Sequence, residues 1–198
     1  MNTTILPVGS KGIDTVQVLN AGMCRALRDS GIDFVVRYLP SLTAHEIGDI
    51  GAANLAFSVV TYANSFDPSD ELAQLNRLQI PKLADVWLDV EGVKDDYVTL
   101  QQRITTWARA IKAAGWTPKQ YDGSQCLLTS EELYALPTVG YWHSCSRVVD
   151  RFGKEAAPSC GWQMHQLHPP NLVVAGVTVD IDFIQKDYKG RSVTFVSV

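Results

Sequence analysis

An acidic stripe marks the segment Asp85-Val-Trp-Leu-Asp-Val-Glu91. If this segment is a strand, its side chains alternate between two faces, and its acids share one face with Trp87. The aliphatic residues between them share the opposite face, which suits packing against helices. Crowded carboxyl groups raise the pKa of one member, which can then act as a general acid near neutral pH. The segment therefore predicts acid–base chemistry at the end of a strand, carried by Asp89 and Glu91.

Two other segments carry acids at corresponding places. Asp14 lies near the end of the first β-type run, and Asp180 and Asp182 share one face of a late one. Any one of these acids, taken alone, could be a strand-end acid, a helix cap or the partner of an arginine. As a set they would repel one another unless a site required them. We therefore expect them to converge at one mouth, where the catalytic candidates are Glu91, Asp89, Asp14 and Asp180.

Such a cluster suits the hydrolysis of a glycosidic bond, which needs a general acid and a second carboxylate or an equivalent group. Sugars also present apolar faces that stack on aromatic rings, and aromatic and amide side chains recur near the expected mouth. Trp142 and Trp162 could equally be core residues, and the three late histidines fit structural roles better. The candidate substrate-binding residues are Asp182, Arg37, Tyr62, Tyr121, Trp142, Trp162 and Gln163.

Short β-type runs alternate with helical segments along the first two thirds of the chain. The clearest helix has four apolar residues at helical spacing between Leu100 and Ile111. Other helix starts are predicted at Asn20, Thr43–Glu46, Asp67-Pro68 and Thr129–Glu132. The expected strands are Gly12–Val16, Asp33–Leu39, Leu55–Tyr62, Leu83–Glu91, Lys119–Gly123, Val139–Cys145, Gly161–Leu167 and Val177–Ile184, with Ser192–Val198 as a candidate for a last one.

This alternation predicts an α/β fold with a parallel sheet, and the strand count favours a closed, compact TIM-like barrel. Its 198 residues fall below the roughly 250 of a typical barrel of this kind, and short or missing late helices account for the difference. We expect one domain over residues 1–198. The alternative is an open doubly wound sheet, but no glycine-rich phosphate loop follows the first strand.

Composition excludes several classes of protein. The net charge is −4 and no basic cluster occurs, which argues against a nucleic-acid partner. No apolar run approaches the roughly 18 residues of a membrane helix, and no GxSxG elbow indicates a serine hydrolase. Residues 1–11 lack the pattern of a secretory signal, so the sequence predicts synthesis in the cytoplasm without one. We expect a monomer with no cofactor.

The four cysteines, Cys24, Cys126, Cys145 and Cys160, are far apart in the sequence and form no CxxC pair. Their spacing fits no common zinc site, so we expect no bound metal. Free buried thiols are the favoured interpretation. One disulfide, for example between Cys145 and Cys160, is the alternative.

Four short motifs, taken in order, resemble the family 25 glycoside hydrolases, the lysozyme-type muramidases. These motifs are Gly12-Ile-Asp14, Leu88-Asp-Val-Glu91, Gly161-Trp-Gln163 and Val179-Asp-Ile-Asp182. A sister group, described as glycoside-hydrolase-like and of largely undefined activity, is more similar still in Phe34–Tyr38, Leu42–Glu46 and Val59–Tyr62. The resemblance implies a (β/α)5β3 barrel, which agrees with the missing late helices.

The resemblance also implies roles for individual residues. Glu91 would be the proton donor with Asp89 beside it, and Asp14 and Asp180 would complete the acidic floor. Asp182 stands where the muramidases often have asparagine. Their aromatic–histidine pair after the third strand is missing, because this chain has Tyr62-Ala63-Asn64.

The implied activity is hydrolysis of a β-linked amino-sugar polymer, with peptidoglycan as the expected substrate and an endolysin-like role. Reaching a cell wall would then require release or export by another system. The alternative is a carbohydrate-binding or cell-wall-binding module on a catalytically degenerate barrel. A non-glycosidic hydrolase on the same barrel is a third interpretation, since fold alone does not choose among them.

Overall fold

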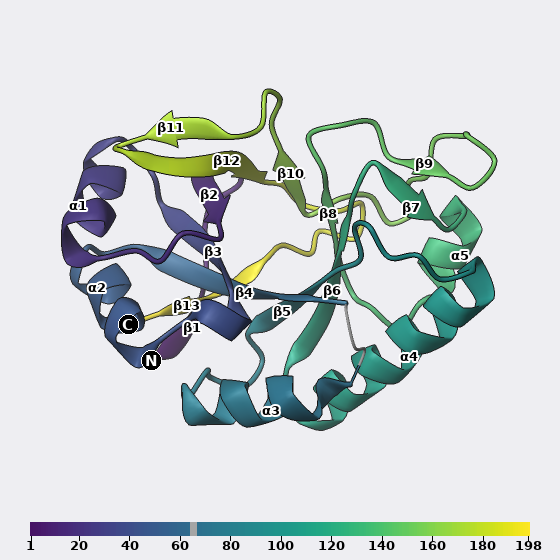
Figure 1. Cartoon of the computed structure of the whole chain (residues 1–198), viewed down its shortest axis with the longest axis horizontal. Helices are drawn as coiled ribbons and strands as arrows, with labels where there is room; N and C mark the ends of the chain where they lie inside the picture. Colours follow the sequence, from purple (N-terminus) through teal and green to yellow (C-terminus); the bar gives the residue numbers. More distant parts are fainter. Residues whose placement is uncertain (64–66) are drawn as a thin grey trace.

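A computed structural model describes residues 1–63 and 67–198 and shows a closed barrel (Figure 1). The hydrogen-bonded order around it is β4-β3-β2-β12-β10-β8-β6-β5, and a pairing of β4 with β5 closes the ring. This confirms the predicted compact α/β barrel. The barrel strands are β2 (Lys11–Thr15), β3 (Phe34–Tyr38), β4 (Ala56–Tyr62), β5 (Asp85–Asp89), β6 (Thr117–Asp122), β8 (Tyr141–His143), β10 (Met164–Gln166) and β12 (Val177–Ile184).

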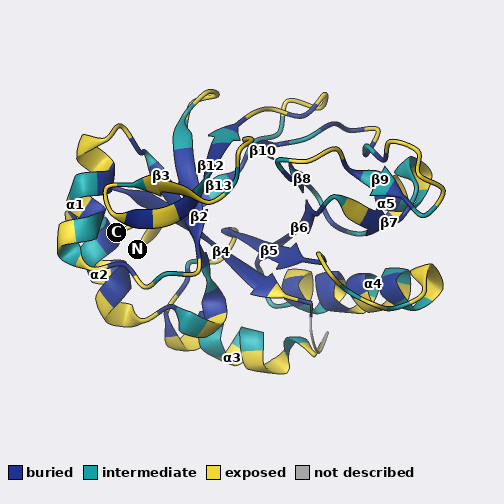
Figure 2. Cartoon of the chain, turned by 45° about the horizontal axis from the view of Figure 1, so that its top comes forward, coloured by how far each residue is buried: buried dark blue, intermediate teal, exposed yellow. Residues whose placement is uncertain are grey.

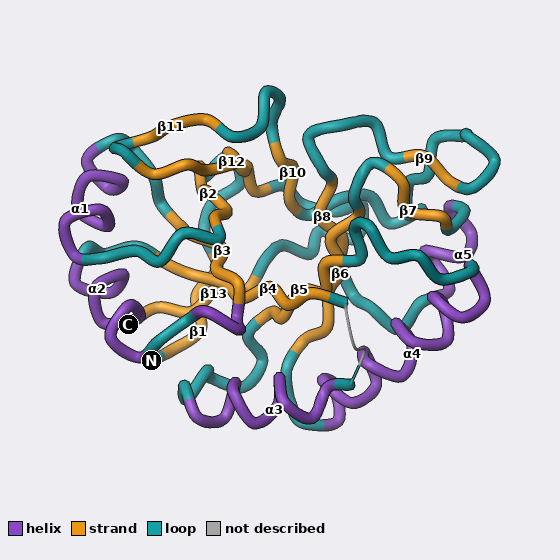
Figure 3. The backbone as a smooth tube through the Cα atoms, in the orientation of Figure 1, coloured by secondary structure: helices purple, strands orange, loops and turns teal. Residues whose placement is uncertain are grey.

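Helices follow the early strands and cover the outside of the barrel over that half (Figure 3). Between β8 and β12 the described chain contains only short strands and loops, as the sequence predicted. The helices are α1 (Ala21–Asp29), α2 (Ala44–Ala52), α3 (Pro68–Arg77), α4 (Tyr97–Ala113) and α5 (Ser130–Ala135), with a 3-10 turn η1 (Leu39–Ser41) after β3. No helix of the described residues is long and apolar enough to cross a membrane.

The expected helix starts are confirmed, with one difference. Asn20 Oδ1 accepts hydrogen bonds from the first turn of α1, and Thr129 and Glu132 form a reciprocal capping box at α5. Thr43 caps α2 through the backbone N–H of Glu46. The Glu46 carboxylate does not return to the cap, because it is paired with Arg37 instead.

Strand β12 differs from the expected geometry, because it runs antiparallel to both of its neighbours, β10 and β2. The other seven barrel strands are mutually parallel. The mouth of the barrel therefore lies at the C-terminal ends of those seven strands and near the N-terminal half of β12. Asp180 therefore reaches the mouth from the N-terminal half of its strand and not from a C-terminal end.

Five further strands lie outside the barrel ring. β1 (Asn2–Ile5) pairs with β13 (Thr194–Ser197), which confirms the last strand and brings the two termini together (Figure 1). β13 then pairs with β4 at a single position near the start of that strand. β11 (Leu172–Val174) forms a hairpin with β12, and β7 (Gln125–Leu127) pairs with β9 (Val149–Asp150).

Two apolar layers hold the barrel together. The larger layer lies between the strands and the helices, both of which contain many buried residues (Figure 2), and it includes the helix residues Ile104 and Trp107. Inside the barrel a smaller layer contains Phe34, Trp87 and Trp142, each at most 1% exposed. Full burial of such side chains stabilises the fold by roughly 1.5–3 kcal/mol each.

Strand β2 needs glycine at position 12 to make room for this inner layer. A Cβ there would lie 2.1 Å from the Phe34 ring, and a ring packed inside the barrel has little room to move.

Candidate active site

The register of the strands brings acids from three of them to one level of the barrel. Asp180 of β12 lies opposite Asp14 of β2. Around the ring, Asp89 of β5 is paired with Tyr62 of β4 and with Tyr121 of β6. The predicted face of β5 is confirmed, since Val86 and Leu88 pack in the outer layer while Trp87 packs inside the barrel. The mouth of the barrel consists of this level and the surface above it.

Asp14 and Asp180 are joined by a side chain that sequence reasoning missed. Gln166 Nε2 donates to Asp14 Oδ2 at 2.9 Å and to Asp180 Oδ2 at 3.0 Å. Asp14 is only 6% exposed, and burial raises its pKa to about 7. The inward face of β10 carries Met164 and Gln166, so strand alternation was the signal that could have found this glutamine.

Asp89 is held by two donors just inside the mouth. Tyr38 Oη donates to its Oδ2 at 3.3 Å, and the backbone N–H of Glu91 donates to its Oδ1 at 2.9 Å. The carboxyl group is buried, and this burial raises its pKa to about 6. Tyr38, which was not among the predicted site residues, stacks on Tyr62 with 4.5 Å between ring centroids.

Glu91 lies beyond the end of β5, in the turn that follows it, and its side chain is exposed. It packs over Gly123, where an added Cβ would lie 2.7 Å from Glu91 Cγ and 2.8 Å from Glu91 Cβ. Atoms so close to the backbone of Glu91 cannot move aside without moving the residue. Glycine at position 123 is therefore what allows Glu91 to occupy this place.

Two of the predicted aromatic candidates are at the mouth. Tyr62 is 39% exposed beside Tyr38, and Tyr121 is 6% exposed, with its Oη donating to Gln166 Oε1 at 3.2 Å. A cavity of about 290 Å³ opens next to Asp14, Tyr38 and Asp180. A second one, of about 350 Å³, opens on the side of Tyr62 toward α3. Asn64, the last residue of the altered aromatic–histidine motif, lies outside the described residues.

Asp182 and Trp142 lie below the mouth rather than at its surface. Asp182 is 0% exposed and Trp142 is 1% exposed, and Trp142 Nε1 donates to Asp182 Oδ1 at 2.9 Å. Because β12 is antiparallel, Asp182 pairs with Gly12 and is one step deeper than Asp180. Side chains buried to this extent do not reach a ligand in the mouth, which corrects their expected place in substrate binding.

Arg37 is on the outer face of β3, away from the acids. Its Nε lies 2.6 Å from Glu46 Oε1 of α2, and both side chains are at most 1% exposed. The backbone N–H of Leu19 donates to the same oxygen, and Arg37 Nη1 donates to the carbonyl of Thr15. Arg37 therefore ties α2 and the loop after β2 to the barrel, in contrast to the expected contact with substrate.

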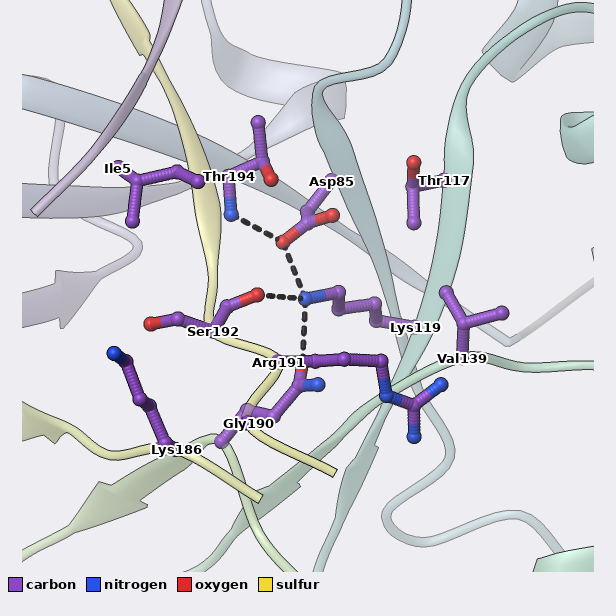
Figure 4. A pocket seen from close by; sticks show the side chains of 11 residues that line it. Ile5, Asp85, Thr117, Lys119, Val139, Lys186, Gly190, Arg191, Ser192 and Thr194 are labelled. Carbon is purple, nitrogen blue, oxygen red and sulfur yellow. Dashed lines mark hydrogen bonds and ion pairs between the residues drawn. The ribbon is translucent and has the colours of Figure 1, made fainter. Parts of the chain in front are cut away.

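Gln163 lies at the opposite, closed end of the barrel, in a pocket whose other lining residues, Asp85 and Lys119 among them, are labelled in Figure 4. There Lys119 Nζ has three acceptors, namely Asp85 Oδ2 and Gln163 Oε1, each at 2.5 Å, and the carbonyl of Ser192 at 3.0 Å. A cavity of about 400 Å³ opens beside this group. Because all three ammonium protons are used, the group fastens the C-terminal segment across the barrel, and the structure moves Gln163 out of the expected site.

Trp162 is half-buried outside the ring of strands, on the side without helices. Its ring contacts His143 at 4.7 Å, and His143 stacks on His165 at 4.8 Å. Burial and the nearby His143 lower the pKa of His165 to about 4. The structure therefore does not bring Trp162 together with the acids of the mouth.

The described residues contain no group of three or more histidine, cysteine, aspartate or glutamate side chains arranged to hold a metal ion. Cys24, Cys126, Cys145 and Cys160 are free thiols.

Neither a protein-family model nor a curated protein matches the sequence. Solved structures do match the fold. An uncharacterized B. stearothermophilus protein has a TM-score of 0.68 at 19% identity, over 89% of this chain and 96% of the other. A family 25 glycosyl hydrolase from Bacillus anthracis has a TM-score of 0.55 at 14% identity, over 92% and 91%.

A third match is the modular Cpl-1 endolysin complexed with a peptidoglycan analogue, with a TM-score of 0.58 at 10% identity. It covers 92% of this chain and 56% of the endolysin chain. At these identities the comparisons establish architecture rather than activity. The chain has the barrel fold found in family 25 glycoside hydrolases and in an endolysin.

Proposed function

We propose that this protein hydrolyses glycosidic bonds in a β-linked amino-sugar polymer, with peptidoglycan as the substrate and Glu91 as the general acid. The observation that carries the proposal is the convergence of Asp14, Asp89 and Asp180 at one mouth, with Glu91 exposed beside them. The barrel is shared with glycosidases, and one of these structural neighbours is complexed with a peptidoglycan analogue.

In this proposal Glu91 protonates the oxygen of the leaving sugar, because it is the acid that a polymer lying across the mouth can reach. Asp89 is fixed by Tyr38 and by the Glu91 backbone, so its carboxyl group can orient a substrate group. We infer that it orients the 2-acetamido group of the substrate, which attacks the anomeric carbon. Asp89 is two residues from Glu91 and does not easily reach the opposite face of the sugar.

Glu91→Gln tests the proposal, because the amide keeps the shape of the side chain but has no proton to donate. Purified protein is incubated with cell-wall sacculi, and released fragments are measured by mass spectrometry, with sedimentation of the sacculi as the binding assay. Loss of a general acid lowers the rate by roughly 10²–10⁴-fold. We expect that loss with binding retained. Equal release by the variant and the wild type would contradict the assignment of Glu91.

The chemical route has its own test. The acetamido oxygen displaces the leaving sugar, and water then displaces the acetamido oxygen, so the two displacements give net retention at the anomeric carbon and require the acetamido group in the substrate. NMR of the first-formed product is expected to show the retained anomer. The inverted anomer, or equal activity on a polymer without the acetamido group, would refute this route.

A carbohydrate-binding module on an inactive barrel is the second candidate. The observation that favours it is that no hydrogen bond from a described residue holds the Glu91 side chain, whereas Asp14 and Asp89 are held firmly. Binding of wild-type protein to sacculi without release of any fragment would establish this module and exclude the enzyme.

A further inference from the structure

Asp182 is a fully buried carboxyl group that lacks the donors an ionised carboxylate needs. Its Oδ1 accepts one hydrogen bond, from Trp142 Nε1 at 2.9 Å. Its Oδ2 is buried and receives no hydrogen bond from any described donor. Asp14 lies on the same inward face of the β2–β12 ladder, because Asp182 is paired with Gly12, two residues from Asp14, and each of the two carboxyl groups shifts the pKa of the other. Two carboxylates cannot hydrogen-bond to each other unless one of them carries a proton.

The described groups that face this pair are either acidic or neutral, and the neutral ones include Tyr38 of β3 and Tyr121 of β6. Asp180 precedes it on β12, Asp89 faces it from β5, and β8 and β10 contribute only the neutral Trp142 and Gln166. None of the salt bridges among residues 1–63 and 67–198 includes any of these acids. An ionised Asp182 would therefore be a buried charge without a counter-charge, which is costly.

We propose that Asp182 is held as the neutral acid and donates its proton to Asp14, so that the two form a pair with one proton. The proton on Oδ2 accounts for the oxygen that has no donor, and Oδ1 remains the acceptor for Trp142. Asp14 then accepts from Asp182 and from Gln166, and these two donors hold its carboxylate in one orientation below the mouth. Asp182 is thus a positioning residue that acts through Asp14.

The titration behaviour of the two groups agrees with this arrangement. Burial raises the pKa of Asp182 well above its usual value, and Asp14 and Asp180 raise it further. The hydrogen bond from Asp182 has the opposite effect on Asp14, since it lowers the pKa of that carboxyl group against the effect of burial. The proton therefore belongs on the deeper member of the pair.

Two substitutions at position 182 distinguish the effect of the hydrogen bond donated to Asp14 from the effect of a side chain that only fills the space. Asp182→Asn keeps an acceptor for Trp142 and offers an N–H to Asp14, but it cannot titrate. Asp182→Leu has the same branching at Cγ and the same number of side-chain heavy atoms, and it offers neither. In carboxyl NMR of aspartate-labelled protein, we expect Asp14 to titrate at the same pH in the wild type and in Asp182→Asn, and at higher pH in Asp182→Leu. The idea fails if Asp182→Asn and Asp182→Leu shift Asp14 equally.

Unfolding equilibria measured as a function of pH give a second, independent readout. A neutral native Asp182 binds a proton that the unfolded chain releases above about pH 4, so wild-type stability falls as the pH rises toward the native pKa. The unfolding equilibrium constant of the wild type should therefore rise about tenfold per pH unit relative to that of Asp182→Asn. A ratio that does not change with pH would show that native Asp182 is ionised and would overturn the proposal.

The role of the pair in the reaction rests on the proposed glycosidase function, so activity forms a separate arm. We expect the acid limb of the pH–rate profile on sacculi to be retained in Asp182→Asn and moved to higher pH in Asp182→Leu. An acid limb that Asp182→Leu leaves in place would refute the positioning role. If the wild type releases no fragments, the glycosidase proposal fails, whereas the NMR and unfolding experiments still decide whether the proton pair exists.

Discussion

The two ends of the barrel both bury charged side chains, but they balance them in opposite ways. At the closed end each acid has a cation, since Asp85 is paired with Lys119 at 2.5 Å and Asp187 with Arg191 at 2.7 Å. At the mouth, Asp14, Asp89 and Asp180 have hydrogen-bond donors but no salt bridge to a described residue.

This difference indicates what each end is for. Paired and hydrogen-bonded charges fasten the C-terminal segment, whereas uncompensated buried acids lower stability and acquire raised pKa values. Such perturbed groups are typical of functional sites. We therefore expect substitutions at the closed end to destabilise the fold, and substitutions at the mouth to change activity and pH dependence.

The largest effect on stability should come from Lys119→Met at the closed end. Removing the ammonium group leaves Asp85 buried without its partner, which costs about 3–5 kcal/mol of unfolding free energy. Denaturant unfolding of the single variant and of the Lys119→Met, Asp85→Leu double variant provides the measurement. The double variant should recover most of the loss, because no unpaired charge remains. A single variant as stable as the wild type would remove the contrast between the two ends.

At the mouth, Gly123→Ala should reduce activity more than stability. The new Cβ would meet Glu91 Cγ at 2.7 Å, so the proposed general acid must move. A displacement of about 1 Å can lower the rate about 10²-fold. Gly48→Ala is the matched control, because no atom lies within 4 Å of an added Cβ in that helix. Unchanged release of fragments from sacculi by Gly123→Ala would argue against a catalytic Glu91.

A smaller, pH-dependent effect is expected for Asp89→Asn. The native pKa of Asp89 is raised to about 6 from an ordinary value of 3.8, so the native state holds a proton that the unfolded chain has lost between these values. Wild-type stability should then fall relative to Asp89→Asn by about 1.4 kcal/mol per pH unit from pH 4 to pH 6, and level off above. Unfolding curves across this range test it. A constant difference would mean that Asp89 titrates normally.

Local sequence pattern determined much of the fold and part of the site. Alternation within β5 placed Asp89 and the aliphatic residues on the correct faces, because that period is a property of any extended chain. Caps at Asn20 and Thr129 were readable for the same reason, since they involve donors only two or three residues away. The missing late helices also followed from local pattern.

Only the tertiary structure decided which long-range partners these residues have. The direction of β12 depends on pairing with β2, about 165 residues away, and it placed Asp182 beneath Asp180 rather than beside it. Long-range packing also pairs Arg37 with Glu46. It places Gln166, rather than Gln163, in contact with the acids of the mouth. The alternation of side chains along a strand specifies which residues share a face. It does not specify which strand lies beside that face, because strand pairing and burial depend on the packing of the whole barrel.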